Sequence, residues 1–241
     1  MWGIIPAAGM GTRIQPLAFS KELLPVGSHM TPGGERPRAV SEYLIERMVK
    51  GGVDKICFVI SPGKADILNY FGGDALSASV FYAVQPQPAG LCDAIFRALP
   101  LIPAEEEVCI GLPDTIWFPD DALSHLPRGK LSLLLFPVAN PERFDSVISG
   151  ANGEVLEVRV KSQEIRSNWI WGAFRMPGSV LAELHEIWKE RRDEYLGTLI
   201  NEYLARGGHA YAHKTGDSYV DVGTLNGYRE ALRLLDARSA P

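Results

Sequence analysis

The sequence has few of the features that mark disulfide-rich, membrane or nucleic-acid-binding proteins. Its three cysteines, Cys57, Cys92 and Cys109, lie in apolar segments without metal-ligand spacing, which favours reduced thiols in a cytoplasm over a disulfide framework. Basic residues form no run and the net charge is −5, which argues against nucleic acid or a membrane surface as a partner. No apolar run is long enough to cross a bilayer, and a strand that begins at Trp2 leaves no room for a signal peptide.

Two common phosphate-binding loops are also missing. No lysine follows a glycine in the Gly-x-x-x-x-Gly-Lys-Ser/Thr order of the P-loop. The dinucleotide-binding fingerprint requires a third glycine where this sequence has Ile14. It also requires an acidic residue at the end of the next strand, where this sequence has Ser61 and Pro62. A P-loop protein and a nicotinamide enzyme are therefore poor interpretations.

No linker, internal repeat or low-complexity tract divides the 241 residues, so we expect one domain. Apolar runs of strand length alternate four times with helical patterns before residue 113, which predicts parallel strands joined by right-handed crossovers. The second half is richer in strands. We therefore predict an α/β fold: a Rossmann-like three-layer αβα sandwich with a mixed, mostly parallel sheet. The polar segment 31–38, rich in Pro and Gly, is expected to be an exposed, mobile loop.

The most informative stretch lies at the start of the chain, between Gly3 and Gly27. A short apolar run predicts a buried strand, and a loop of small residues follows it. Gly9 and Gly11 leave the backbone bare, so that successive N–H groups could close around an anion. Arg13 adds a planar guanidinium group with several N–H donors, and Lys21 adds a compact ammonium charge. Together these residues predict a site for a triphosphate.

The strings 9–13 (Gly-Met-Gly-Thr-Arg) and 21–25 (Lys-Glu-Leu-Leu-Pro) resemble the signature of the sugar-phosphate nucleotidylyltransferases. The resemblance is greatest to the branch with glucose-1-phosphate thymidylyltransferase and bacterial UTP–glucose-1-phosphate uridylyltransferase. These enzymes join a nucleoside triphosphate to a sugar 1-phosphate and release pyrophosphate. The resemblance implies a nucleotide-binding half at residues 1–115 and a sugar-phosphate-binding half at residues 116–241.

The same resemblance assigns roles to the residues of the loop. Arg13 would hold the leaving β- and γ-phosphates, and Lys21 would bridge the α-phosphate and the incoming phosphate; these two are the expected catalytic residues. The expected nucleotide-binding residues of this loop are Ala8, Gly9, Gly11 and Thr12.

Three later loops extend the resemblance. After the predicted strand 80–84, Gln85 and Gly90 match a loop that reads the base, and the Gln85 amide can offer both a donor and an acceptor to a pyrimidine. Asp114 and Asp221 follow two further strands and match the family's magnesium-binding positions. Mg²⁺ prefers one or two carboxylates together with phosphate oxygens and water, so Mg²⁺ is the expected cofactor.

The acceptor side departs from the family pattern. Asp145 stands where the sugar-recognising branch has a glycine, and Val160 replaces a carboxylate that would bind sugar hydroxyls. Lys161 and Gly172 match, so Asp145, Lys161 and Gly172 are the expected sugar-phosphate-binding residues. A buried carboxylate needs a donor or a cation. Asp145 could pair with an arginine, Arg143 or Arg159, or it could meet an amino or hydroxyl group of an unusual acceptor.

Other functions stay open at this point. A nucleotide-sugar glycosyltransferase shares the α/β layout, but it usually carries an Asp-x-Asp pair, and residues 113–116 (Pro-Asp-Thr-Ile) lack the second aspartate. A non-catalytic nucleotide-sensing homologue would explain the altered acceptor positions. The expected partners are a nucleoside triphosphate (dTTP or UTP) and a sugar 1-phosphate, and a homo-oligomer is allowed.

Overall fold

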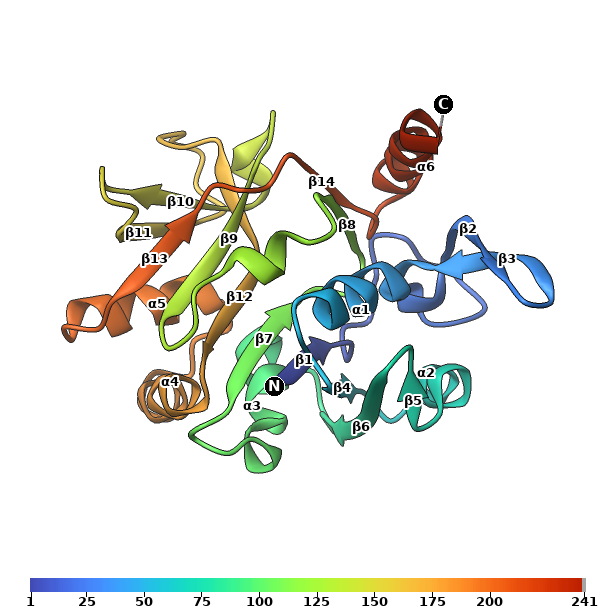
Figure 1. Ribbon diagram of the computed structural model, residues 1–241. Coiled ribbons are helices and arrows are strands. Elements are labelled where there is room, and N and C mark those ends of the chain that lie inside the picture. The colour runs from blue at the N-terminus through green and yellow to red at the C-terminus, as the bar shows by residue number, and fades with distance from the viewer. Residues whose placement is uncertain (240–241) are drawn as a thin grey trace.

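A ten-stranded mixed sheet runs through the centre of the computed structural model, which describes residues 1–239 (Figure 1). The strands follow the order β11-β10-β12-β7-β1-β4-β6-β5, and β9 pairs with β12 and with β13. The strands of this sheet are β1 (Trp2–Pro6), β4 (Lys55–Ile60), β5 (Asp74–Ala75), β6 (Ala78–Val84), β7 (Glu107–Gly111), β9 (Leu131–Pro137), β10 (Asp145–Ser149), β11 (Val155–Val160), β12 (Trp169–Pro177) and β13 (Ala210–His213).

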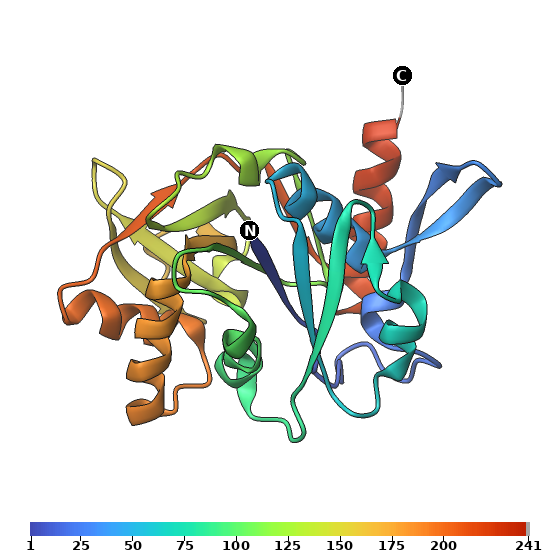
Figure 2. The ribbon, with the colours of Figure 1, turned by 60° about the horizontal axis from the view of Figure 1, so that its bottom comes forward.

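Helices cover both faces of this sheet, because successive side chains of its strands point to opposite sides. Ile4 packs in one core cluster with α3 and α4, and Ile5 packs in another with α1. Figure 2 shows α1 and α3 on opposite sides of β1. The helices are α1 (Val40–Lys50), α2 (Ala65–Phe71), α3 (Gly90–Arg97), α4 (Gly178–Arg191), α5 (Leu196–Ala205) and α6 (Leu225–Ser239). The predicted three-layer α/β fold is confirmed.

The parallel part of the sheet explains where a ligand can bind. Strand β1 pairs in parallel with β4 on one side and with β7 on the other, and β4 pairs in parallel with β6. The chain thus moves outward from β1 to β6 and then returns to the far side of β1. In open α/β sheets, ligands bind at the carboxyl ends of the strands where the order reverses in this way. The loop after β1 lies at this point.

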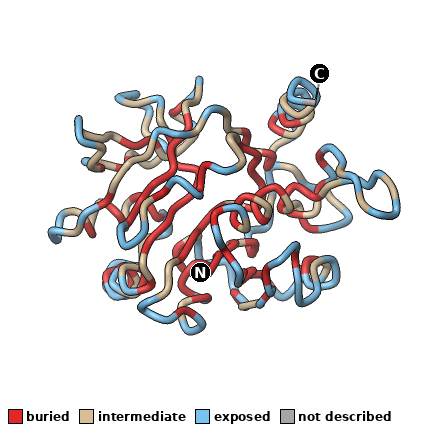
Figure 3. The backbone as a smooth tube through the Cα atoms, viewed as in Figure 1, coloured by how far each residue is buried: buried red, intermediate tan, exposed pale blue. Residues whose placement is uncertain are grey.

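The second half of the sheet is mostly antiparallel. Strand β12 pairs antiparallel with β7 and β9, and β10 pairs antiparallel with β11. Figure 3 shows that the buried positions follow the central strands, whereas the outer loops are exposed. The three cysteines are free and buried, and burial raises the pKa of each thiol to about 12. None of the helices in residues 1–239 is long and apolar enough to span a bilayer.

A separate two-stranded ladder joins distant parts of the chain. Strand β8 (Thr115–Phe118) pairs antiparallel with β14 (Ser218–Asp221), and Thr115 lies opposite Asp221. Val220 packs in a third core cluster with Val26 and with Ala231 of α6. The ladder therefore anchors the carboxyl end of β14 next to the loop that follows β7.

Residues 31–38 are largely exposed, as predicted, but most of them form strands and not a loop. Strand β2 (Pro25–Thr31) and strand β3 (Gly34–Ala39) form a hairpin that projects from the body of the molecule (Figure 2). Gly34 takes a φ of +106°, and the Thr31 hydroxyl donates to the Gly34 carbonyl oxygen at 2.8 Å. At the base, the Tyr43 hydroxyl donates to the Val26 carbonyl oxygen at 2.8 Å. Glycine at a positive φ thus marks the hairpin turn.

Candidate active site

The glycine-rich loop continues directly from β1. The Ala7 N–H donates to the Val59 carbonyl oxygen at 2.8 Å, and Ala8 is buried behind the loop. Gly11 has a φ of +63° and its carbonyl oxygen accepts from the Ile14 N–H at 3.1 Å. A Cβ at Gly9 would meet no atom within 4 Å. The backbone is therefore bare at Gly9, as predicted, whereas Gly11 packs against Lys21. Phosphate binding by this loop stays a prediction.

Lys21 lies against this loop and forms a partly buried ion pair. Its Nζ is 2.5 Å from Asp114 Oδ2, and a Cβ at Gly11 would lie 2.8 Å from Lys21 Cδ. Burial alone would raise the pKa of Asp114, but the ammonium of Lys21 holds it below the usual value. Burial alone would lower the pKa of Lys21, but the carboxylate of Asp114 outweighs burial and raises that pKa. Both groups are therefore charged at neutral pH.

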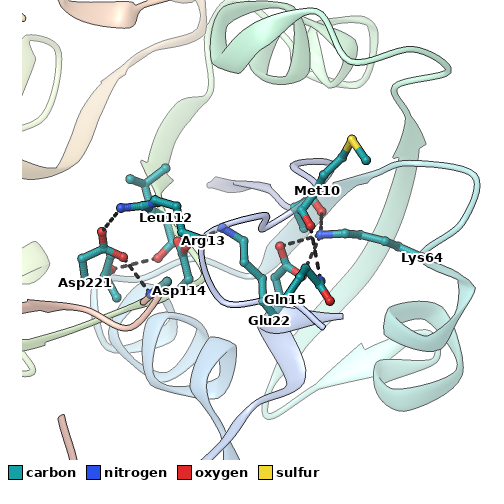
Figure 4. Close-up of polar contacts among 12 residues, drawn as sticks. Met10, Arg13, Gln15, Glu22, Lys64, Leu112, Asp114 and Asp221 are labelled. Atoms are coloured by element: carbon teal, nitrogen blue, oxygen red, sulfur yellow. Dashed lines mark hydrogen bonds and ion pairs between the residues drawn. The ribbon is translucent and has the colours of Figure 1, made fainter. Parts of the chain in front are cut away.

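Arg13 and Asp221 form a second ion pair beside the first. Arg13 Nη1 lies 3.1 Å from Asp221 Oδ2, and the Gly223 N–H donates to Asp221 Oδ1 at 2.8 Å. A Cβ at Gly223 would lie 2.8 Å from Asp221 Oδ1, 3.0 Å from Asp114 Oδ2 and 3.2 Å from Arg13 Nη2. Figure 4 shows the two aspartates next to each other with Arg13 alongside. The structure thus brings together four residues predicted from distant parts of the sequence.

The two aspartates suit a divalent cation that is completed by its substrate. Their carboxylates converge over Gly223, which has no side chain to separate them. Within residues 1–239, no group of three His, Cys, Asp or Glu side chains gathers as a metal site. Two carboxylates plus phosphate oxygens and water are the ligand set that Mg²⁺ prefers. The donor set therefore fits the predicted Mg²⁺ on Asp114 and Asp221.

A buried ion pair on the other side of the loop was missed from the sequence. The Lys64 Nζ donates to both carboxylate oxygens of Glu22 and to the Ala7 carbonyl oxygen, at 2.7–2.8 Å (Figure 4). Glu22 is 0% exposed and Lys64 is 9% exposed. Because Glu22 follows Lys21 in the short helix 21–23, this pair ties the first loop, Lys21 and the segment before α2 together. Lys64 follows a Pro-Gly turn in a polar segment, so no apolar pattern indicated its burial.

The predicted base-reading loop is more enclosed than the sequence indicated. The Gln85 amide donates to the Asp93 carboxylate at 2.8 Å and to the Gly90 carbonyl oxygen at 3.1 Å. These two bonds use both hydrogens of the amide, so that of the predicted donor and acceptor only the carbonyl oxygen stays available. Gly90 has a φ of +84°, and a Cβ there would lie 3.2 Å from the Cα of Glu194. Glycine at this position therefore allows the loop to approach residue 194.

The three predicted acceptor-side residues lie on adjacent strands at one end of the sheet. Asp145 is opposite Val160 and next to Ser146, which is opposite Ile170. Lys161 follows Val160, and Gly172 lies at a bulge of β12, where a Cβ would lie 2.5 Å from Phe136 and 2.9 Å from Tyr219. The alternative in which Asp145 pairs with an arginine is wrong. Arg159 pairs with Glu164 instead, and no ion pair joins Asp145 to any residue of 1–239.

Tyr219 connects the acceptor side to the two aspartates. Burial raises the pKa of its phenol well above the usual value, and the charges of Asp221, Asp114 and Asp145 raise it further. Its ring packs edge-on against Phe144 with centroids 5.9 Å apart. All three carboxylates thus lie within electrostatic range of one side chain.

The comparison with known proteins decides the family. The family model described as Nucleotidyl transferase matches residues 2–238. The chain belongs to the nucleotidyl transferase family. A glucose-1-phosphate thymidylyltransferase of Mycobacterium tuberculosis is 29% identical over 252 residues, which cover 99% of this chain and 84% of that protein. One from Neisseria meningitidis is 27% identical over 243 residues, covering 96% and 81%.

Solved structures share the fold of this nucleotidyl transferase. A Bacillus anthracis protein assigned as a glucose-1-phosphate thymidylyltransferase and solved with sucrose has a TM-score of 0.82 at 23% identity, covering 100% of this chain and 97% of that one. A UDP-glucose pyrophosphorylase of Acinetobacter has a TM-score of 0.78 at 21% identity, covering 98% and 93%. The predicted family and enzyme class are confirmed, and the glycosyltransferase alternative finds no support.

A methyl group at Gly223 is expected to disturb the site of this nucleotidyl transferase. The Gly223→Ala change would push a Cβ against Asp221 and Asp114, and misplacement of catalytic groups by a fraction of an ångström can cost about 10-fold in kcat/KM. Steady-state kinetics would check this. Gly73→Ala is the matched control, because a Cβ there meets no atom within 4 Å. If Gly223→Ala and Gly73→Ala have equal kcat/KM, the carboxylates of Asp114 and Asp221 do not converge over Gly223 as described.

The stability of this nucleotidyl transferase should depend on Asp145 in a pH-dependent way. Burial raises the pKa of the Asp145 carboxyl despite the nearby Lys161, so ionisation is harder in the folded chain than in the unfolded chain. The contribution of the Asp145 carboxyl to stability is present at any pH below the pKa that it has in the unfolded chain. It is lost as the pH rises through the higher pKa that it has in the folded chain. Asp145→Asn is therefore expected to be the more stable protein at pH 7 and to lose that advantage near pH 3. Chemical unfolding at both pH values would measure this. A destabilised Asn variant at pH 7 would be the contrary result.

Proposed function

We propose that this protein is an Mg²⁺-dependent nucleotidylyltransferase that joins a pyrimidine nucleoside triphosphate, dTTP or UTP, to a sugar 1-phosphate and releases pyrophosphate. The observation that carries the proposal is the pair of ion pairs, Lys21–Asp114 and Arg13–Asp221, which meet at Gly223 beside the glycine-rich loop. Two cations and two carboxylates at one point suit a reaction between two phosphate groups.

The chemistry needs positioning and charge compensation more than a general base. A sugar phosphate is largely ionised at neutral pH because its second pKa is about 6, so one of its oxygens can attack directly. The obstacle is the repulsion between the attacking phosphate and the triphosphate. Arg13 would bind the β- and γ-phosphates, which leave as pyrophosphate. Lys21 would contact the α-phosphate and the incoming phosphate, so that both anions share one cation during in-line displacement.

The remaining predicted residues divide between the two substrates. Ala8, Gly9, Gly11 and Thr12 would present the loop backbone to the phosphates, and Gln85 and Gly90 would contact the base. Lys161 would contact the sugar 1-phosphate beside Asp145 and Gly172. Asp114 and Asp221 would hold Mg²⁺, which supplies charge neutralisation on phosphate oxygens when it is bound. The relatives named for thymidylyl transfer and the structure named for UDP-glucose support a pyrimidine nucleotide.

A pyrophosphate-release assay tests this proposal. Each of dTTP, UTP, ATP, GTP and CTP is combined with a panel of sugar 1-phosphates, with Mg²⁺ or with excess chelator, and the NDP-sugar is identified by mass. Release that requires both substrates and the metal is the expected result. A non-catalytic sensing homologue would bind nucleotide but release no pyrophosphate with any pair, and that outcome would overturn the proposal.

A further inference from the structure

The side-chain amide of Gln85 has only one orientation that its neighbours can satisfy. Its nitrogen donates to Asp93 Oδ2 at 2.8 Å and to the Gly90 carbonyl oxygen at 3.1 Å. A carboxylate and a backbone carbonyl group have lone pairs but no hydrogen, so both partners can only accept. Turning the amide over would set its oxygen against two other oxygens. The Gln85 nitrogen therefore faces these two partners, and the Gln85 oxygen points away from them.

Arg97 binds both oxygens of the Asp93 carboxylate. It lies four residues further along α3, and its Nε donates to Oδ2 at 3.2 Å while its Nη2 donates to Oδ1 at 3.0 Å. Asp93 is 6% exposed and Gln85 is 5% exposed, so water competes little for these bonds. Hydrogen bonds to a charged acceptor are about twice as strong as neutral ones. The pair of Asp93 and Arg97 thus determines which end of the Gln85 amide can meet a ligand.

Gln85 follows its strand at the same edge of the sheet as the glycine-rich loop. Strand β6 pairs in parallel with β4, and β4 pairs in parallel with β1. The Gln85 N–H donates to the Ile60 carbonyl oxygen at 2.9 Å, and the Ala7 N–H donates to the Val59 carbonyl oxygen at 2.8 Å. Both residues therefore lie at the carboxyl ends of parallel strands, where ligands of open α/β sheets bind.

The Gln85 oxygen is available to such a ligand. Within residues 1–239 the hydrogen bonds of this side chain all involve its nitrogen. The oxygen is also not one of the unpaired polar atoms in that range that are closed off from solvent. An oxygen that can only accept distinguishes between pyrimidines. Uracil and thymine carry a hydrogen on N3, which can donate to it, whereas cytosine has a lone pair on N3, which would repel it.

We propose that Asp93 is a positioning residue through which this enzyme selects uracil and thymine over cytosine. This inference rests on the proposed function, in which Gln85 contacts the base. Asp93 holds the Gln85 amide with its oxygen toward the base, so that cytosine leaves this oxygen without a donor. A site built to bond an N–H group discriminates strongly against a substrate that lacks it, because the polar group of the site is then unpaired.

Steady-state kinetics with matched pairs of triphosphates test the proposal. UTP is compared with CTP, and dTTP with dCTP. The triphosphate of pyrimidin-2-one riboside is also compared with UTP, because it keeps the N3 lone pair of cytosine and lacks the amino group. We expect kcat/KM to favour the base with the N3 hydrogen by about 100-fold in each pair, mainly through KM. Rejection of the pyrimidin-2-one compound would show that N3 decides, and not the amino group.

Variants separate base selection from general damage. Asp93→Asn brings a donor as well as an acceptor, so the Gln85 amide can turn over and offer its nitrogen to cytosine. The preference for UTP over CTP should then fall to about 10-fold or less. Asp93→Ser, which also brings a donor, serves if the Asn variant does not fold. The matched control is Glu202→Gln on α5, which removes the carboxylate of another pair with an arginine four residues away and should keep the preference.

The outcomes distinguish this inference from the function on which it rests. Equal kcat/KM for UTP and CTP in the unmodified protein overturns the inference alone and leaves nucleotidyl transfer standing. A folded Asp93→Asn variant that loses activity with every triphosphate but keeps the ratio of UTP to CTP gives Asp93 a structural role only, and this also overturns the inference. No pyrophosphate with any acceptor and triphosphate overturns both.

Discussion

Replacing Lys21 by alanine is expected to lower kcat/KM for pyrophosphate release by about 10²–10³-fold, the usual cost of removing one preorganised charge from a transition state. Lys21 lies between the glycine-rich loop and Asp114, where it would meet both reacting phosphates. Its loss removes a cation where the negative charges approach each other. The effect should appear mainly in kcat, because binding of the triphosphate still has Arg13 and the loop backbone.

The control for Lys21→Ala is Lys189→Ala, which removes an exposed lysine paired with Glu186 on α4. Circular dichroism and thermal unfolding must show that the Lys21 variant is folded, since Asp114 is left without its cation. The pKa of Asp114 should rise in that variant. In the unmodified protein, the lowered pKa of Asp114 stabilises the fold at any pH above the pKa that this group has in the unfolded chain. That stabilisation is lost as the pH falls through the pKa of Asp114 in the folded chain. Near-normal turnover of folded Lys21→Ala would refute the catalytic role.

Removing Lys64 is expected to have the largest effect on stability. Lys64→Met leaves the Glu22 carboxylate and the Ala7 carbonyl oxygen buried without their donor, and breaking a buried ion pair in this way costs about 3–5 kcal/mol. For a chain of this length, a loss of that size corresponds to a fall in Tm of roughly 10 °C. Urea unfolding with the free energy extrapolated to water would measure it.

The double variant Glu22→Leu/Lys64→Met gives the sharper result. Burial raises the pKa of Glu22 and lowers that of Lys64 despite their mutual attraction, so burying the charges costs more than the pair returns. Apolar replacement of both partners should then recover most of the stability lost in either single variant. A double variant as unstable as the sum of the two single variants would show that the pair itself stabilises the fold. Glu186→Ala and Lys189→Ala, an exposed pair, should change stability by about 0.5 kcal/mol or less.

Much of the fold followed from local patterns in the sequence. The run Lys55–Ile60 was readable as a central strand because a strand buried on both faces needs apolar residues throughout. Glycines and prolines marked most of the loop positions. The hairpin after Pro25 was missed because its residues are polar and exposed, and its order comes from Tyr43 and from α6 rather than from its own composition.

Part of the candidate site could likewise be predicted from the sequence, and part could not. The loop residues, Lys21 and the two aspartates could be predicted because each stands in a short string with few alternatives. The Lys64–Glu22 pair and the enclosed Gln85 amide could not. These depend on which side chains meet after folding, and pairs far apart in the sequence leave no local signal.

The ladder between β8 and β14 has a consequence for synthesis of the protein. Arg13 and its partner Asp221 are 208 residues apart, and Asp221 reaches Asp114 only after β14 has paired with β8. A nascent chain emerges from the ribosome with its amino-terminal part first, and domains fold as their sequence becomes available. The glycine-rich loop would therefore be exposed long before its second carboxylate exists. Chains that end before residue 218 should therefore lack the Arg13–Asp221 pair and show no nucleotidyl transfer, so β14 must be made before the site can work.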